Sequence, residues 1–336
     1  MDDTSSRAIS DSKATDAGGP WTPSVLFAAA KMYYEDDATQ AEIAARIGVS
    51  RPTVSRLLSE ARRQGIVKIT VIEPAHEAED ELRRRVEGVL NLRRVYLTVP
   101  LPVEVPGGNE EYLGKALGPA VGRALIDAGL GHGDALLVSS GRTLYEVART
   151  RLPQFPGVVV APAIGGIDQP EDWYQTNEIT RLFAAGIAGR AQYLFAPALP
   201  GPSLHRTLRR DPTIQRVLRL WPQARVVLTG VGAAPMLRAQ VPQYAPTGGD
   251  LLWEAVGDVC GRFFDRAGSP VDFPGSDRLI ALELADLREL PVVVAVAAGL
   301  DKVTPIIVGA RAGYFNQLVT DPLTAEQILA RAAEGS

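Results

Sequence analysis

The chain has 336 residues, of which 46% are hydrophobic and 22% charged, and this length predicts two or three domains at roughly 100–200 residues per domain. Its net charge of −4 argues against a protein that coats nucleic acid nonspecifically, because such proteins are basic overall. The single cysteine, Cys260, excludes an intramolecular disulfide and a cysteine-cluster metal site, and we expect it to be a buried thiol.

Neither a signal peptide nor an apolar run near the ~20 residues of a membrane span is present, so we expect a cytoplasmic protein without a membrane partner. Residues 1–20 are rich in Asp, Ser, Ala and Gly and are expected to be a disordered tail. Residues 21–74 are expected to form a helix-turn-helix DNA-binding domain, which is all-α and winged-helix-like. Its first helix is predicted from Ser24 to Tyr34.

Two short helical patterns meet at Gly48 and carry the DNA-binding prediction. Gly48 accepts the positive φ that the reversal of the chain requires. Ser50 is a natural N-cap for the second helix, and Pro52 lies in its first turn, where its missing N–H is not needed. Apolar periodicity alone would also fit an ordinary pair of antiparallel helices. The small, capping and basic residues together favour a helix-turn-helix.

The second helix of this pair presents polar and basic residues away from its apolar stripe. The N-terminal end of such a helix enters the major groove, where Arg reads guanine and hydroxyls reach bases or phosphates. Between Arg46 and Lys68 the only acidic residue is Glu60, so this module is basic although the whole chain is acidic. The residues expected to contact DNA are Thr39, Gln40, Ser50, Arg51, Thr53, Ser55 and Arg56.

The following segments lead into a larger domain. Residues 66–72 are β-branched except for Lys68 and predict a strand that braces or links the DNA-binding unit. Residues 75–92 form a charged helical pattern, which fits a linker or dimerising helix and equally a solvated surface helix. Residues 93–336 are expected to form an effector domain that begins with a strand at 94–99.

From Glu110 onward, long helices alternate with short aliphatic strands. Continuous aliphatic strands between helices predict a parallel, two-sided α/β sheet of Rossmann-like architecture. The strands are expected at 135–138, 158–160, 191–195, 225–228, 292–296 and 315–319. The helices are expected at 110–129, 142–152, 177–189, 302–312 and 323–333.

Ligands of open α/β sheets bind beyond the carboxyl ends of the strands. The strand at 135–138 runs into a small, hydroxyl-rich turn with one Arg, which favours a phosphate site at a helix start. Its residues are Ser139, Ser140, Gly141, Arg142 and Thr143. The turn lacks the Gly-Lys-Ser/Thr ending of a Walker loop, and a tight strand-to-helix turn is the plain alternative.

Further strand-end residues are candidates for ligand contacts: polar side chains for sugar hydroxyls, a glycine pair whose backbone could meet a ligand, and a Lys at a helix start, where the dipole disfavours a cation unless it faces an anionic ligand. They are the glycine pair Gly165 and Gly166, the polar residues Asn177 and Glu178 at a helix start, Asp258, and Lys302. Each could instead serve only local capping. Gly230 to Gly232 is a weak dinucleotide motif because Pro235 stands where the third Gly would be, and no cofactor is expected. The three histidines, His76, His132 and His205, show no metal-ligand spacing.

As a set, the stretches described so far resemble the SorC family of bacterial transcriptional regulators. The resemblance is carried by residues 40–63, 140–144, 161–166, 255–258, 297–302 and 316–325. It implies an effector domain similar to sugar-phosphate isomerases, and a homo-oligomer, dimer or tetramer, whose affinity for operator DNA changes when a phosphorylated sugar binds. By this resemblance, residues 140–143 would hold the phosphate, and Gly165, Gly166, Asp258 and Lys302 would line the sugar.

We therefore expect a regulator of carbohydrate catabolism genes, a repressor or activator that works in the cytoplasm on the nucleoid. The alternative is a sugar-phosphate isomerase or deaminase fused to a DNA-binding module. Such enzymes need a placed acid/base pair, often with His. His132 precedes its strand, and His205 lies in a Pro/Ser-rich stretch, so we expect no enzyme activity. A DNA-cutting enzyme would need a carboxylate cluster, and none is evident. With few Lys near residue 140, no Schiff base to an aldehyde is expected.

Overall fold

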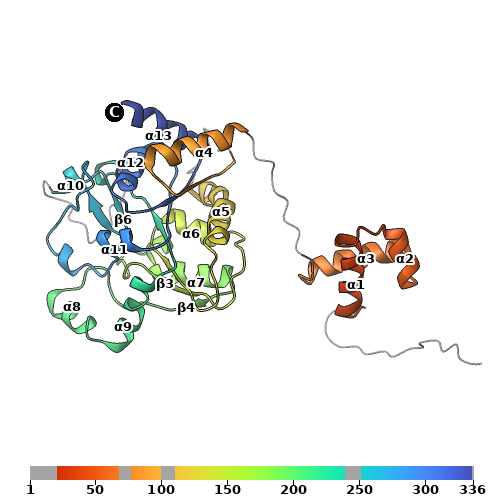
Figure 1. Cartoon of the computed structure of the whole chain (residues 1–336). Helices are drawn as coiled ribbons and strands as arrows, with labels where there is room; N and C mark the ends of the chain where they lie inside the picture. Colours follow the sequence, from red (N-terminus) through yellow and green to blue (C-terminus); the bar gives the residue numbers. More distant parts are fainter. Residues whose placement is uncertain (1–20, 68–76, 100–109, 239–250, 335–336) are drawn as a thin grey trace, which may run out of the picture. The chain divides into compact units, whose positions relative to one another are not determined.

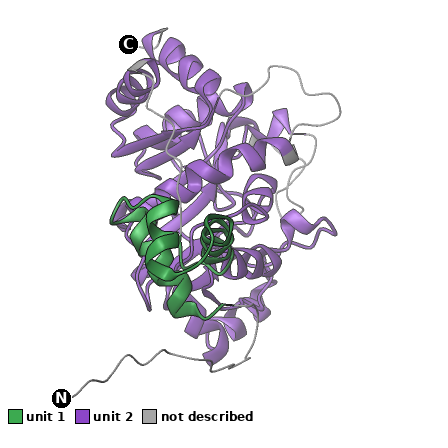
Figure 2. Cartoon of the chain, turned by 90° about the vertical axis from the view of Figure 1, so that its right-hand side faces the viewer, with its two compact units in different colours: residues 1–74 green, residues 75–336 purple. Residues whose placement is uncertain are grey.

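The computed structural model describes residues 21–67, 77–99, 110–238 and 251–334. The chain divides into two compact units, residues 1–74 and 75–336 (Figure 2). The expected disordered tail and most of the strand expected at 66–72 lie outside the described residues.

The smaller unit contains three described helices, as the sequence predicts. They are α1 (Pro23–Tyr34), α2 (Gln40–Ile47) and α3 (Arg51–Arg63). Their apolar faces meet in one core, in which Leu26, Ile43, Val54 and Leu57 are fully buried. Gly48 ends α2 with φ of 75°, the left-handed conformation that the turn between α2 and α3 requires.

The larger unit is built on one parallel sheet of seven strands in the order β1-β9-β8-β5-β2-β3-β4. The strands are β1 (Arg94–Leu97), β2 (Ala135–Val138), β3 (Val159–Pro162), β4 (Arg190–Ala191), β5 (Val226–Gly230), β8 (Val293–Val296) and β9 (Gln317–Thr320). This confirms the parallel α/β prediction, and the central strands are buried on both faces as their aliphatic runs imply.

Helices cover both faces of this sheet (Figure 1). One face packs against α5 (Glu110–Asp127), α6 (Arg142–Ala148) and α7 (Thr176–Gly186). The other face packs against α4 (Glu77–Leu90), α9 (Pro212–Leu218), α11 (Leu284–Glu289), α12 (Val303–Arg311) and α13 (Pro322–Glu334). Neighbouring residues of one strand alternate between the two cores: Leu136 and Val138 face α5 to α7, and Leu137 faces the opposite side.

Helix α4 belongs to the larger unit. From the sequence, residues 75–92 were expected to form a segment separate from both domains. In the structure, Val86 and Leu90 are buried in the main core, and α4 lies along α13 (Figure 1). This burial explains the apolar line in an otherwise charged helix, because one stripe faces the core and the rest faces solvent.

The edge strand β1 is closed by charged side chains. The backbone N–H of Val95 donates to Glu87 Oε1 at 2.9 Å, and Arg83 Nη1 holds this carboxylate at 3.0 Å. The guanidinium of Arg123 donates to the carbonyl of Leu97 at 2.6 Å. Side chains from α4 and α5 therefore satisfy backbone groups that an open edge would present to another strand.

Several elements differ from the prediction. The strand expected at 191–195 is reduced to Arg190–Ala191, because the backbone of Leu194 is bound by the side chain of Asn177. An antiparallel hairpin of β6 (Gly257–Val259) and β7 (Arg262–Phe264) was not predicted. The short helices α8 (Pro202–Leu208) and α10 (Leu251–Glu254), and α9 as well, were also missed.

Candidate functional site

A cavity of about 900 Å³ lies at the carboxyl ends of β2, β5 and β8, the central strands of the sheet. From β2 the chain continues to β3 and β4 on one side, and β5, β8 and β9 lie on the other. The gap between β2 and β5 is therefore the point where the strand order reverses, which is the usual ligand site of open α/β sheets.

The turn between β2 and α6 forms one wall of this cavity. Gly141 has φ of 129° and ψ of 150°, a conformation that only glycine adopts without strain, and it leads directly into α6. The hydroxyls of Ser140 and Thr143 line the cavity, as does the side chain of Arg142. The first N–H groups of α6, at Arg142 and Thr143, have no acceptor within the helix. The turn thus gathers donors suited to an anion.

Two of the predicted donors in this turn serve the protein itself. The hydroxyl of Ser139 is buried, accepts the N–H of Gly230 at 3.3 Å and donates to the carbonyl of Ser140 at 3.2 Å. The N–H of Gly141 donates to the carbonyl of Trp173 at 2.9 Å. Both groups fix the turn, so the donors that face the cavity come from Ser140, Arg142 and Thr143.

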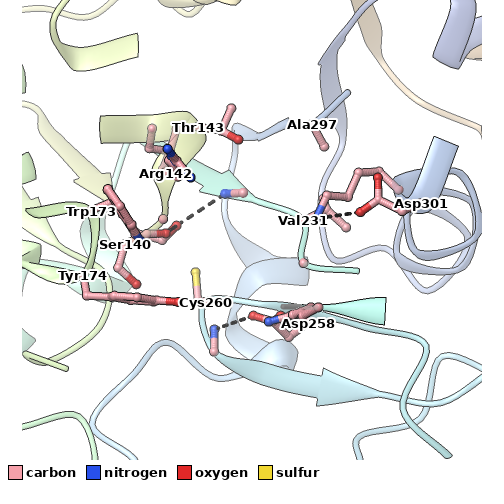
Figure 3. A pocket seen from close by; sticks show the side chains of 18 of the residues that line it. Ser140, Arg142, Thr143, Trp173, Tyr174, Val231, Asp258, Cys260, Ala297 and Asp301 are labelled. Carbon is pink, nitrogen blue, oxygen red and sulfur yellow. Dashed lines mark hydrogen bonds and ion pairs between the residues drawn. The ribbon is translucent and has the colours of Figure 1, made fainter. Parts of the chain in front are cut away.

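A short 3₁₀ helix, η1 (Asp172–Tyr174), supports this wall and was not recognised in the sequence. The ring of Trp173 lies under the guanidinium of Arg142 (Figure 3). The Tyr145 hydroxyl donates to Asp172 Oδ2 at 3.0 Å. Tyr174 also lines the cavity, and burial together with the charge of Glu171 raises the pKa of its phenol. The phenol is therefore a hydrogen-bond donor at neutral pH. Trp173 and Tyr174 carry no sequence signal because they lie in a loop without periodicity.

The turn after β8 forms the opposite wall. Gly299 repeats the backbone of Gly141, with φ of 119° and ψ of 152°, before η5 (Leu300–Lys302). Asp301 and Lys302 line the cavity, and Lys302 Nζ lies 3.5 Å from Asp301 Oδ2. Figure 3 shows Arg142 and Trp173 on one side of the cavity and Asp301 on the other.

An ion pair between Arg238 and Asp258 closes the cavity along a third side. The guanidinium of Arg238 contacts Asp258 Oδ1 and also donates to the carbonyl of Ala233 at 2.7 Å. Asp258 Oδ2 accepts the N–H of Gly261 at 3.2 Å. The carboxylate predicted to accept sugar hydroxyls is thus present at the cavity, already held by a cation that the sequence did not reveal.

Cys260 occupies the turn of the β6–β7 hairpin and lines the same cavity. Its φ of 50° is unusual for a residue other than glycine, and with Gly261 at 76° it gives the two left-handed residues of a tight hairpin. Its thiol is buried as expected, donates to Thr229 Oγ1 at 3.5 Å, and has a pKa raised by burial to about 12.

Not every predicted effector residue reaches the cavity. Those that line it are Ser139, Ser140, Gly141, Arg142, Thr143, Asp258 and Lys302. Gly165 and Gly166 lie outside it, in close backbone contact: a Cβ on Gly165 would meet the carbonyl of Ala196 at 2.8 Å. The Asn177 amide also lies outside the lining, because it accepts the N–H of Leu194 at 2.9 Å and donates to its carbonyl at 3.2 Å.

In the smaller unit, the residues predicted to contact DNA surround the N-terminal ends of α2 and α3. Arg51, Ser55 and Arg56 are exposed on α3. A shallow depression of about 510 Å³ brings Thr39, Gln40 and Arg51 together.

Two of the hydroxyls in this set, those of Thr39 and Ser50, act as helix caps. Thr39 forms a capping box with Glu42, whose pKa is lowered mainly by the backbone hydrogen bond from Thr39. Ser50 accepts the N–H of Thr53 at 3.3 Å, and the two hydroxyls lie 2.8 Å apart. These caps fix the helix ends that carry Gln40 and Arg51.

Within the described ranges, no group of three or more His, Cys, Asp or Glu is arranged to hold a metal ion. None of the helices in the described part of the chain is long and apolar enough to cross a membrane.

Comparisons with known proteins identify both units. The Sugar-bind family of sugar-binding domains matches residues 76–330, and the Crp-like helix-turn-helix domain family matches residues 28–75. The sorbitol operon regulator of Klebsiella pneumoniae is 31% identical over 313 residues, covering 89% of this chain and 96% of that protein. The deoxyribonucleoside regulator of Bacillus subtilis is 30% identical over 308 residues, covering 90% and 96%. The crystal structure of the full-length Klebsiella pneumoniae regulator SorC superposes with a TM-score of 0.65 at 30% identity, covering 91% of this chain and 98% of that one.

Proposed function

Because this chain belongs to the SorC family of transcriptional regulators and is a DNA-binding regulator of carbohydrate genes, we propose that a phosphorylated sugar in the strand-end cavity sets its affinity for operator DNA. The observation that carries the proposal is the β2–α6 turn, in which Ser140, Arg142 and Thr143 converge on a cavity at the sheet's reversal point. Guanidinium and hydroxyl donors at one end of a cavity fit a phosphate dianion better than a neutral hydroxyl group.

The remaining walls suit the sugar part of the same ligand. Asp258 offers acceptor oxygens, while Tyr174 and Lys302 offer donors, so a polyhydroxylated chain or ring would meet both kinds of partner. The aromatic side chains of Trp173 and Tyr174 supply apolar surface beside these polar groups. This combination of a few placed polar groups with aromatic surface is typical of small-molecule sites.

We propose that the cavity binds this sugar without converting it. The cavity lining contains no histidine in the described part of the chain. His132 lies against Gly157, at the amino end of the strands, and His205 lies on α8. The isomerase alternative would need a general acid/base pair at the ligand. Both carboxylate oxygens of Asp258 are already engaged within the protein, Oδ1 by Arg238 and Oδ2 by the N–H of Gly261.

For the smaller unit, we propose that the N-terminal end of α3 enters the major groove of the operator. Arg51 and Arg56 would then reach base edges, and Gln40 would reach the phosphate backbone of the DNA. Symmetric oligomers bind operators that contain two matching half-sites, one for each copy of the regulator. A homo-oligomer, either a dimer or a tetramer, is therefore part of this proposal. Such a regulator works in the cytoplasm, on the nucleoid.

The test compares Arg142→Ala with Arg151→Ala, an exposed Arg just beyond α6 that does not line the cavity. Thermal unfolding is followed with a panel of pentose and hexose phosphates and with the same sugars unphosphorylated. At a hundredfold excess over Kd, a ligand should stabilise the wild type by about 2.7 kcal/mol. We expect this stabilisation to need the phosphate, to vanish in Arg142→Ala and to persist in Arg151→Ala.

Three results would overturn the proposal. The first is a wild type that no sugar phosphate stabilises. The second is an Arg142→Ala variant that is stabilised as much as the wild type. The third is conversion of a panel sugar phosphate by the purified protein, which would favour the enzyme alternative.

A further inference from the structure

We propose that Thr324 and Asp321 are positioning residues of the effector site: they fix the Gly299 turn and, through it, the cavity wall that carries Lys302. The inference rests on the proposed function, since it concerns how the same cavity recognises the sugar part of its ligand. Neither residue lines the cavity, so both would act through Gly299.

The contacts form one continuous chain from α13 to the cavity. The N–H of Gly299 donates to Thr324 Oγ1 at 2.8 Å. The Thr324 hydroxyl donates in turn to Asp321 Oδ2, and Asp321 Oδ1 accepts the N–H of Thr324 at 3.0 Å. The carbonyl of Gly299 accepts the N–H of Lys302 at 3.0 Å. Each polar group in the chain thus fixes the next.

Burial makes this arrangement more than an ordinary helix cap. Asp321 is 4% exposed and Thr324 is 1% exposed, so neither can exchange its partner for water. The bond between the Asp321 carboxylate and the Thr324 N–H is local to the start of α13 and would exist in any capped helix. The bond from Gly299 to the Thr324 hydroxyl joins segments 25 residues apart. This second bond serves the turn and not the helix.

The two glycine turns of the cavity show why such a bond is needed. Gly141 and Gly299 share nearly the same φ and ψ, and each lies between a central strand and a helix. A glycine in this region has more conformational freedom than any other residue, so a turn built on it needs an external restraint. The N–H of Gly141 is held by the backbone carbonyl of Trp173, and the N–H of Gly299 by the side chain of Thr324.

Restraint of Gly299 determines where Lys302 lies. Lys302 ends η5, only three residues after Gly299, and precedes the first residue of α12. Its ammonium group and the Asp301 carboxylate both reach the cavity. Loss of the Thr324 hydroxyl would remove the acceptor of the half-buried Gly299 N–H, and we expect the turn to shift toward another acceptor.

The test uses Thr324→Val, which keeps the shape of the side chain, and Thr324→Ser, which keeps the hydroxyl as a matched control. An equimolar mixture of pentose and hexose phosphates serves as the probe, and inorganic phosphate serves as the probe of the β2–α6 turn alone. We expect the concentration of the mixture that gives half-maximal thermal stabilisation to rise about tenfold in Thr324→Val and to stay within about twofold in Thr324→Ser. The response to inorganic phosphate should not change.

A double-mutant cycle with Lys302→Gln separates positioning from general damage to α13. If Thr324 acts through the Gly299 turn, the loss of affinity in the double variant should be smaller than the sum of the single losses. Hydrogen exchange of the Gly299 amide should accelerate in Thr324→Val and stay protected in Thr324→Ser. Should Thr324→Val not fold, Asp321→Asn gives a milder version of the same loss, because its amide nitrogen no longer accepts the hydroxyl.

The outcomes separate this inference from the proposed function. A wild type that ignores the mixture contradicts the proposed function. A wild type that responds, with Thr324→Val equal to it or with additive effects in the cycle, overturns the positioning role alone. A drop in unfolding temperature without a change in the half-maximal concentration or in Gly299 exchange would also overturn it, since it would show a purely structural role.

Discussion

The guanidinium carbon of Arg142 lies 4.4 Å from the ring centroid of Trp173, while the N–H of Gly141 is bound to the Trp173 carbonyl at 2.9 Å. One residue from η1 therefore holds both the backbone and the cationic side chain of the β2–α6 turn. A cation over an aromatic face is restrained without losing its N–H donors, which stay directed at the edge of the guanidinium. This contact would order the proposed anion site before a ligand arrives.

Replacing Trp173 should therefore weaken binding of phosphorylated sugars although Trp173 is uncharged. A cation–π contact of about 1 kcal/mol corresponds to roughly a fivefold rise in Kd for Trp173→Leu. Trp173→Phe, which keeps an aromatic face, should lose less. Calorimetric titration with the sugar phosphate that best stabilises the wild type measures the Kd of both variants. Equal affinity in Trp173→Leu and wild type would show that the stack has no role in binding.

Gly232 is the position where the smallest substitution should disrupt the Arg238–Asp258 pair. A Cβ there would lie 1.9 Å from Asp258 Oδ1 and 2.0 Å from Arg238 Nη2. Both atoms end side chains that are mostly buried, so Gly232→Ala should separate the ions and destabilise the protein by about 1–3 kcal/mol. Sugar-phosphate binding should weaken as well. Urea unfolding measures the loss of stability, and the thermal shift caused by added sugar phosphate measures the loss of binding.

Gly201 provides the control for this substitution. It has φ of −63°, and no heavy atom would lie within 4 Å of an added Cβ. Gly201→Ala should therefore leave both stability and binding close to wild type. If Gly232→Ala also leaves stability and binding close to wild type, the added Cβ does not separate Arg238 from Asp258.

The buried thiol of Cys260 predicts a loss of stability at alkaline pH. Burial raises its pKa to about 12 from an ordinary 9.0, so the folded state retains a proton that the unfolded chain releases. The resulting stabilisation is complete below about pH 9 and is lost as the pH rises toward about 12. Tyr96, whose pKa burial also raises to about 12, adds to the same decline.

Cys260→Ala isolates the contribution of the thiol. Unfolding free energies measured at pH 8 and at pH 10.5 should differ less in this variant than in the wild type, whatever the baseline cost of the substitution. The contribution of Tyr96 is common to both proteins and cancels in the comparison. An identical decline in the two proteins would contradict burial of the thiol.

On the DNA-binding unit, Arg56→Ala should cost more specific affinity than Arg62→Ala. Both residues are exposed on α3, but Arg56 lies in the N-terminal half of the helix and Arg62 lies in its last turn. A lost base contact corresponds to about 1–3 kcal/mol, or roughly 5- to 150-fold in operator affinity, whereas a lost phosphate contact weakens all sequences alike. Binding to operator and to unrelated DNA at several salt concentrations distinguishes them. Comparable losses on both DNAs would place Arg56 outside the groove.

Much of the fold is readable in the sequence because local patterns determine it. Gly48, Ser50 and Pro52 specify the reversal and start of α3 through backbone conformation and capping alone. The buried parallel strands are continuous aliphatic runs, since both of their faces are covered. The position of the β2–α6 turn follows from the same rule, because the carboxyl ends of parallel strands share one edge.

The rest of the site depends on contacts between distant segments, which no local pattern records. Trp173 meets Arg142 across 31 positions, and Arg238 meets Asp258 across 20. The glycine pair at 165–166 suggested a ligand, yet its lack of side chains serves the close approach of the backbone at Ala196. The β6–β7 hairpin was missed because Cys260, and not an Asn or Gly, takes the first left-handed position of its turn.

The closed edge of β1 has a consequence for how copies of this chain can associate. Glu87 accepts the N–H of Val95 and Arg123 donates to the carbonyl of Leu97, so a strand from a second copy would find these two backbone groups of β1 already occupied. At the opposite edge of the sheet, β4 has only two residues, which are too few to form a long hydrogen-bond ladder with another strand. A continuous β-sheet between two copies is therefore disfavoured at either edge, and we expect any association between copies to use helix or loop surfaces, which can repack without breaking a backbone ladder.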